Sequence, residues 1–194
     1  MKLDGNARKI IFEDAHTHSH WLEEKVDDAV LREAFDLAKI GPTSANCSPM
    51  RITFVKSPEA KEKLKQCLQE GNIEKTMKAP ATAIIAMDME FYEKLPKLFP
   101  QADARSWFAG NQKSIEETAF RNSSLQGAYF IVAARAMGLD CGPMSGFDRN
   151  KCDELFFKGT PVKSNFLCNL GHGDKSKLYP RNPRLAFDEA CKVL

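Results

Sequence analysis

Residues 41–49 carry a dense set of small side chains that form hydrogen bonds at short reach. Between a predicted helix and a predicted strand they read Gly-Pro-Thr-Ser-Ala-Asn-Cys-Ser-Pro. Glycine and proline fix the backbone at the ends of this run, so its hydroxyl, amide and thiol groups extend from a preset loop. Such a loop suits a flat ligand rimmed with heteroatoms. It also suits an ordinary solvated turn, and the run alone does not decide between them.

A second loop with the same character covers residues 139–148, Leu-Asp-Cys-Gly-Pro-Met-Ser-Gly-Phe-Asp. Its two glycines and proline allow backbone N–H groups to approach a ligand closely. The loop follows the longest predicted helix and precedes a helix that Asp148 can cap. Alone, it too is compatible with a simple turn.

Three histidines, His16, His18 and His20, alternate with small polar residues. In an extended segment their side chains lie on one side, where they could bind a transition metal, bind an anion or stay idle on a solvated arm. No acidic residue elsewhere stands out as a fourth ligand. We therefore predict no metal site.

The common nucleotide-binding patterns are missing from the sequence. Gly171-His172-Gly173 follows a predicted strand, but the third glycine of the dinucleotide motif is absent and Pro180 and Pro183 exclude the required helix. No Walker motif occurs. The six cysteines include no C-x-x-C pair, which favours a reducing cytoplasm over a disulfide framework or a zinc site.

Apolar periodicity and capping residues predict four main helices, over residues 27–40, 58–70, 115–137 and 149–157. The third contains a stretch, residues 128–134, that is apolar all round. A helix of this kind is expected to be central and buried on most sides. One chain of this size does not readily bury every face of such a helix, so the pattern favours a homodimer.

Three segments, residues 51–55, 81–87 and 165–170, have the composition of strands. Residues 90–110 concentrate aromatic side chains among prolines and charges, and are expected to form either a lid of short helices or a satellite hydrophobic cluster. Together these elements predict an α+β domain with helices around a small sheet.

Composition limits the protein class further. The chain has 194 residues, which favours a single domain over residues 1–194. A net charge of +2 with interspersed basic and acidic residues gives no basis for binding nucleic acid or an anionic membrane. No signal peptide or spanning segment is visible, so a cytoplasmic location is expected.

Several long segments resemble the nitroreductase family of FMN-dependent oxidoreductases, over essentially the whole chain. They are the two loops described above, Asp-Ala-Arg-Ser-Trp-Phe (103–108), Glu-Glu-Thr-Ala-Phe-Arg-Asn-Ser-Ser (116–124) and a late Arg-Asn-Pro-Arg (181–184). Within the family, the chain most resembles the malonic semialdehyde reductases of pyrimidine degradation, also called 3-hydroxypropionate dehydrogenases.

The resemblance implies an α+β, nitroreductase-like fold with a small mixed sheet surrounded by helices. It also implies a homodimer with the central helix at its interface and FMN bound at each of two subunit boundaries. Three groups of residues would contact the cofactor. They are Pro42, Thr43, Ser44 and Asn46 from the partner subunit; Asn72 and Lys75 at the isoalloxazine edge, with Pro143, Met144, Ser145 and Gly146 passing over the ring near N5; and Arg184 with Arg181 at the phosphate.

Two positions depart from the family pattern. The usual opening Arg-x-Ser-x-Arg/Lys, which contacts the flavin phosphate, corresponds here to His16-Thr-His18-Ser-His20. Histidine is only partly charged near neutral pH, so its role as a phosphate ligand is open. Ser145 stands where many members carry glutamate beside N5, which is expected to alter the flavin potential and substrate choice.

The activity implied by the resemblance is ping-pong hydride transfer from NADH or NADPH, through FMN, to a small aldehyde. For malonic semialdehyde, Arg105 or Arg121 would hold the carboxylate, while Trp107, Phe108 and Phe91 would roof the pocket. The rival hypotheses are a broad nitroaromatic or quinone reductase with the same cofactor and, more distantly, a non-catalytic flavin- or metal-binding protein. The sequence does not separate NADH from NADPH.

Overall fold

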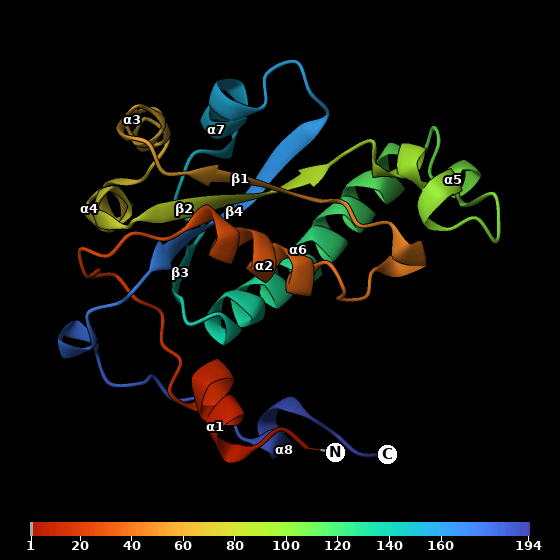
Figure 1. Ribbon diagram of the computed structural model, residues 1–194. Helices are drawn as coiled ribbons and strands as arrows, with labels where there is room; N and C mark the ends of the chain where they lie inside the picture. Colours follow the sequence, from red (N-terminus) through yellow and green to blue (C-terminus); the bar gives the residue numbers. More distant parts are fainter. Residues whose placement is uncertain (1) are drawn as a thin grey trace.

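The computed structural model describes residues 2–194 and is built on a four-stranded sheet with helices on both faces (Figure 1). The strands are β1 (Met50–Val55), β2 (Ala81–Asp88), β3 (Asp140–Met144) and β4 (Val162–Gly171), in the spatial order β1-β2-β4-β3. All eight residues of β2 are buried, which agrees with its unbroken apolar sequence.

The sheet is antiparallel in all three of its strand pairs. This corrects the expected mixed sheet, since the parallel pairing among the described residues is limited to one isolated bridge between Thr17 and Cys141. The register places Met50 opposite Met87 and Val55 opposite Thr82. The segment before β1 therefore lies at the opposite end of the sheet from the segment before β2.

Two helix pairs form the outer layers. Helices α2 (Asp28–Ala38) and α6 (Gln112–Ala136) pack on one face, and α3 (Pro58–Lys65) and α7 (Arg149–Phe156) on the other (Figure 1). The side chains of Ser57 and Asp148 cap α3 and α7. The predictions for α2, α6 and α7 are confirmed to within a few residues.

The predicted helix over residues 58–70 is confirmed at its start and wrong at its end, because the chain breaks after α3 and restarts as α4 (Glu70–Lys78). The break serves a tertiary contact: Leu68 forms a bridge with Phe147, and the Gln69 N–H donates to the Gly146 carbonyl at 3.1 Å. Strand β3 was expected as a loop, and it is a short strand beside β4.

Residues 90–110 form short helices packed around a hydrophobic cluster of their own. Two 3-10 helices, η3 (Phe91–Lys94) and η4 (Ala104–Trp107), flank α5 (Leu95–Leu98). The rings of Phe91 and Phe108 meet edge to face, with centroids 5.0 Å apart. Both alternatives expected for this region are thus partly right: the helices are short, and their aromatic residues make a satellite core.

One face of α6 is uncovered in the single chain, against the expectation of burial on most sides. Phe120, Leu125 and Tyr129 are each exposed by about half, at 50%, 47% and 46%. The opposite face packs on α2 and the sheet. An apolar stripe of this size on a central helix is typical of a subunit interface.

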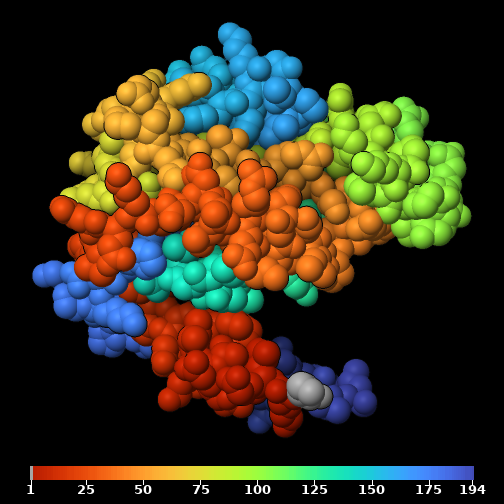
Figure 2. All heavy atoms as spheres, in the orientation of Figure 1, coloured from red at the N-terminus to blue at the C-terminus, as the bar shows by residue number. Residues whose placement is uncertain are grey.

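The two ends of the chain extend away from the body on the same side (Figures 1 and 2). The amino end forms α1 (Gly5–Arg8) and a π-helical turn (Lys9–Glu13), and the carboxyl end forms α8 (Phe187–Ala190). Within residues 2–194, no helix has the length and apolar content needed to span a bilayer.

Candidate functional site

The loop 41–49 has an unusual backbone. Ala45, Asn46 and Ser48 have φ angles of 49°, 51° and 40°, in the left-handed region that non-glycine residues seldom adopt. Strained residues persist where the surrounding structure holds them, and they cluster at functional sites. Three of them within four positions favour a ligand-binding loop over an ordinary turn.

Two buried side chains of α6 hold this loop in place. Asn122 Oδ1 accepts from the Ser44 N–H at 2.8 Å, and Gln126 Oε1 accepts from the Met50 N–H at 2.9 Å. The Thr43 hydroxyl accepts from the Ser48 N–H at 3.1 Å. The polar residues that interrupt the apolar pattern of α6 thus serve to fix the loop.

Cys47, inside the same loop, is not a nucleophile at neutral pH. Its side chain is buried, and burial raises the pKa of the thiol to about 11. The reactive form of cysteine is the thiolate, which is scarce at that pKa. The chemistry of the loop is therefore that of its hydroxyl and amide groups.

The structure brings α4 together with the segment after β3. Asn72 Nδ2 donates to the Gly146 carbonyl at 2.7 Å, and a Cβ atom on Gly146 would lie 2.3 Å from that nitrogen and 2.8 Å from Gln69 Oε1. Any larger residue at position 146 would displace the side chains of Asn72 and Gln69 from these positions. The side chain of Lys75, one turn along α4, has no acidic partner within residues 2–194.

Two backbone donors are free at this junction. The N–H groups of Ser145 and Gly146 have no acceptor within the described chain, although Ser145 is exposed and Gly146 half-buried. Just before them, Pro143 and Met144 lie at the end of β3, and Met144 Sδ accepts from the Thr76 hydroxyl at 3.6 Å. A pair of adjacent free N–H groups is a site for an electronegative atom of a ligand.

The segment 16–21 runs beside this junction. Thr17 bridges Cys141, Trp21 bridges Gly173, and Trp21 Nε1 donates to the Lys75 carbonyl at 3.0 Å. The extended segment thus has its Trp21 end against α4. Its other end, at His16, lines a separate cavity.

The three histidines have different surroundings. His18 is buried (3% exposed), with Nε2 3.3 Å from Asp140 Oδ1, and burial lowers its pKa despite the carboxylate. His18 therefore belongs to the core of the domain in its neutral form. His20 is exposed and His16 is partly buried at the cavity. Among residues 2–194, no group of three or more histidine, cysteine or acidic side chains is arranged to hold a metal ion.

The cavity at His16 has a volume of about 360 Å³ and is basic. Arg181 and Arg184, which the sequence analysis assigned to a phosphate, line it together with Arg135 from α6. None of its lining residues within the described chain is acidic. Arg135 was missed, because a single basic residue near the end of a helix carries no local signal.

The loop 41–49 lies at the other end of the sheet from these groups. It precedes Met50, which pairs with the last part of β2, whereas α4 precedes the first residue of β2 (Figure 1). Asn46 Nδ2 donates to the Leu98 carbonyl at 2.8 Å, beside the satellite cluster. Pro42, Thr43, Ser44 and Asn46 therefore do not join α4 within one chain.

The residues suggested for substrate binding are dispersed. Arg105 is held by Glu93 through two hydrogen bonds of 2.8 and 2.7 Å. Phe108, like Phe91, is buried in the satellite cluster, whereas Trp107 is 53% exposed. Arg121 forms no ion pair within residues 2–194 and lines a hollow of about 510 Å³ on the exposed face of α6.

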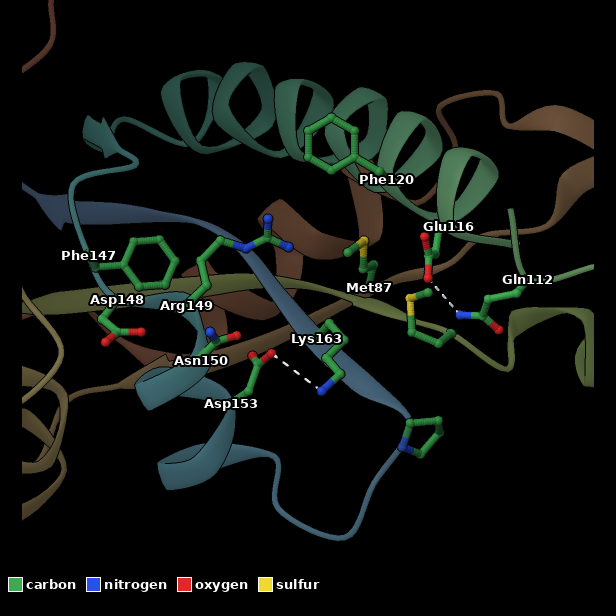
Figure 3. Close-up of a pocket in the computed structure, with 12 residues that line it drawn as sticks. Met87, Gln112, Glu116, Phe120, Phe147, Asp148, Arg149, Asn150, Asp153 and Lys163 are labelled. Atoms are coloured by element: carbon green, nitrogen blue, oxygen red, sulfur yellow. Dashed lines mark hydrogen bonds and ion pairs between the residues drawn. The ribbon is translucent and has the colours of Figure 1, made fainter. Parts of the chain in front are cut away.

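A larger groove has a volume of about 870 Å³. Phe147 forms part of its wall directly after Gly146, and Met87 lies at the end of β2. Figure 3 shows Phe120 of α6 on the opposite side of the groove from Arg149 and Lys163. Apart from the loop that contains Phe147, sequence reasoning did not identify this groove, because its walls come from four separate segments.

Comparison with known proteins identifies the family. The model of the nitroreductase family matches residues 14–172. The chain is 61% identical over 191 residues to a Burkholderia lata protein provisionally named NADH dehydrogenase/NAD(P)H nitroreductase, covering 98% of each. The chain belongs to the nitroreductase family. A Polynucleobacter asymbioticus protein with the same name is 60% identical, over 99% of this chain and 98% of its own length.

Solved structures agree with the nitroreductase fold. A Bacillus subtilis nitroreductase superposes with a TM-score of 0.87 at 20% identity, over 95% of this chain and 97% of its own. A nitroreductase from Exiguobacterium sibiricum in complex with FMN gives 0.86 at 17% identity, over 100% and 99%. The α+β, nitroreductase-like fold expected for this chain is thereby confirmed.

Proposed function

We propose that this nitroreductase-family protein is an FMN-dependent NAD(P)H oxidoreductase that works as a homodimer. One observation carries the proposal: the segment 16–21 links a basic, acid-free cavity to a junction with free backbone donors and an unpaired lysine. A flavin mononucleotide has a phosphate at one end and a flat, heteroatom-rimmed ring at the other. The two halves of the site fit those two ends.

The residues at each end have separable tasks. Arg181 and Arg184 match the geometry of a phosphate, since a guanidinium donates two parallel hydrogen bonds. Lys75 supplies a positive charge for the pyrimidine edge of the ring, which stabilises the reduced, anionic form of a flavin. The N–H groups of Ser145 and Gly146 are available to the reactive edge.

When bound, FMN accepts a hydride from NADH or NADPH and delivers it to a second substrate. The chain itself orients the reactants and excludes water, and no acid–base dyad is required for this chemistry. The nicotinamide and the second substrate would bind in turn at the same face of the flavin ring, which gives ping-pong kinetics. The groove beside Phe147 is the space in which they would lie.

The test of this proposal is sequential reduction without oxygen. The purified protein is expected to carry flavin absorbance, to bleach on addition of NADH or NADPH, and to regain colour when an acceptor is added. Flavin that does not bleach with either nicotinamide would make the protein a passive binder. Absence of flavin after reconstitution with FMN would overturn the proposal outright.

For the acceptor we propose malonic semialdehyde, reduced at its aldehyde carbon to 3-hydroxypropionate, as in pyrimidine degradation. Support comes from the long sequence segments shared with that subgroup. Of the two arginines suggested for the carboxylate, Arg105 is engaged by Glu93, so Arg121 is the better candidate. It lies on the uncovered face of α6.

A broad nitroaromatic or quinone reductase is the second candidate, favoured by the names of the two relatives at about 60% identity. The two functions separate in the reoxidation step. Fast recovery of colour with malonic semialdehyde and slow recovery with a nitroaromatic compound supports the first. The reverse order supports the second, and Arg121→Gln should then leave the rate unchanged.

A further inference from the structure

The basic cavity contains a third arginine that neither the family motif nor the sequence analysis includes. Arg135 comes from the last turn of α6, whereas the other lining residues come from segments 12–17 and 178–184. Two distant parts of the chain, α6 and the segment 178–184, thus place three arginine side chains around one space of about 360 Å³.

Arg135 is only partly satisfied by the protein. Its Nη1 donates to the Ile11 carbonyl at 3.3 Å, and its Nε is buried with no hydrogen-bond partner within the described chain. A buried donor without an acceptor is costly, and charged donors most of all. In native structures such a group calls for an explanation, and an acceptor supplied by a bound water, ion or ligand is one.

The other two arginines are fixed by backbone carbonyls, so their charge is not cancelled. Arg181 donates to the carbonyls of Glu13 and Ala15, both at 2.8 Å, and Arg184 donates to the carbonyl of Asn182 at 2.9 Å. The carboxylate of Glu13, whose carbonyl Arg181 contacts, is itself bound by Arg8 at 2.9 Å. The cavity therefore holds three permanent positive charges.

We infer that Arg135 is a third guanidinium ligand of the flavin phosphate. It supplies from α6 the permanent charge that the opening His16-Thr-His18-Ser-His20 lacks, since His18 is buried against Asp140 and only His16 of the three lines the cavity. This inference rests on the proposed function, because it takes FMN as the ligand.

The experiment compares two ligands that differ only in the phosphate. Apoprotein is titrated with FMN and with riboflavin by flavin fluorescence, for the wild type, Arg135→Gln and Arg135→Lys. Arg135→Gln is expected to weaken FMN binding about tenfold or more, as loss of hydrogen bonds to a charged group does, and to leave riboflavin binding unchanged. Arg135→Lys keeps the charge but loses the planar guanidinium, so its FMN affinity is expected to lie between those of the wild type and Arg135→Gln.

Arg32→Gln, an exposed arginine on α2, serves as the matched control and is expected to bind both ligands as the wild type does. Equal weakening of FMN and riboflavin by Arg135→Gln would mean that Arg135 only supports the fold, and unchanged FMN binding would mean that it is no ligand. Either result overturns the inference. Wild-type apoprotein that binds neither ligand would overturn the proposed function itself.

Discussion

Gly146 lies in a close approach within the proposed flavin site. Substitution by alanine places a methyl group 2.3 Å from Asn72 Nδ2, so the side chains of Asn72 and Gln69 must shift and the hydrogen bond from Asn72 to the Gly146 carbonyl is disturbed. We expect Gly146→Ala to lower the free energy of unfolding by about 1–3 kcal/mol, as overpacking does, and to weaken flavin binding. Urea unfolding and a flavin titration measure the two effects.

Gly71→Ala provides the control, because Gly71 lies on α4 next to Asn72. Its added methyl group meets no atom within 4 Å, and alanine restricts the unfolded chain more than glycine does. We expect Gly71→Ala to stabilise the protein by about 0.4–1 kcal/mol, with flavin affinity intact. Equal effects of the two substitutions would remove the special role of Gly146.

His18 makes stability depend on pH. Burial lowers the pKa of the folded-state imidazole below its ordinary value of 6.5, so the unfolded chain binds the proton more readily. The free energy of unfolding therefore rises with pH between the folded-state pKa and the unfolded-state pKa of His18. The contribution of neutral His18 is full above about 6.5 and is lost as pH falls through the folded-state pKa.

We expect the wild type to lose more stability than His18→Gln between about pH 7.5 and about pH 5.5, as followed by urea unfolding. Ser19→Ala, an exposed substitution beside His18, gives the comparison and should keep the wild-type slope. Parallel slopes for the wild type and His18→Gln would show that carboxylates alone set this dependence.

At the scale of elements, α6 connects its uncovered apolar face to the strained loop. Asn122→Ala removes the acceptor of the Ser44 N–H and leaves that donor unpaired. We expect a loss of about 1–3 kcal/mol in the free energy of unfolding and faster hydrogen exchange at the Ser44 amide. Lys113→Ala, an exposed change on the same helix, should alter neither quantity. Unchanged exchange at Ser44 would argue against this coupling.

Elements with strong periodicity were predictable, and those set by tertiary contacts were not. The pattern of α6 and the apolar run of β2 determine those elements locally. Strand β3 contains Gly142 and Pro143, which are rare in strands and tolerated here because β3 lies at the edge of the sheet. The break between α3 and α4 has no glycine or proline and depends on contacts with Gly146 and Phe147.

The same distinction holds for the site. Its loops could be recognised in the sequence because glycine, proline and small polar residues gather in short runs. The resemblance of these runs to one family then pointed to the cofactor. Arg135 and the groove beside Phe147 depend on segments that meet only in the folded chain. Local sequence patterns therefore could not place them.

At the scale of the whole molecule, two of the proposed flavin-binding segments lie far apart in one chain. The loop 41–49 and the α4 junction lie at opposite ends of the sheet, and between them α6 presents an uncovered apolar face. A twofold dimer through α6 would bring the loop of one subunit toward the junction of the other. This arrangement explains why one chain alone contains a strained loop with no ligand group beside it.

Complementation between two disabled variants tests this arrangement. Asn46→Ala impairs the loop and Arg184→Gln impairs the phosphate end, so each homodimer should bind FMN weakly. If the loop serves the partner's flavin, a mixed dimer has one site with both lesions and one intact site, and is expected to bind one FMN with wild-type affinity. If both residues serve the flavin of their own chain, each site of the mixed dimer carries one lesion and no tight binding returns.

Leu125→Glu, on the uncovered face of α6, tests the dimer itself. It should give a folded monomer by sedimentation that binds no FMN tightly, because the loop of the partner subunit is then missing from each site.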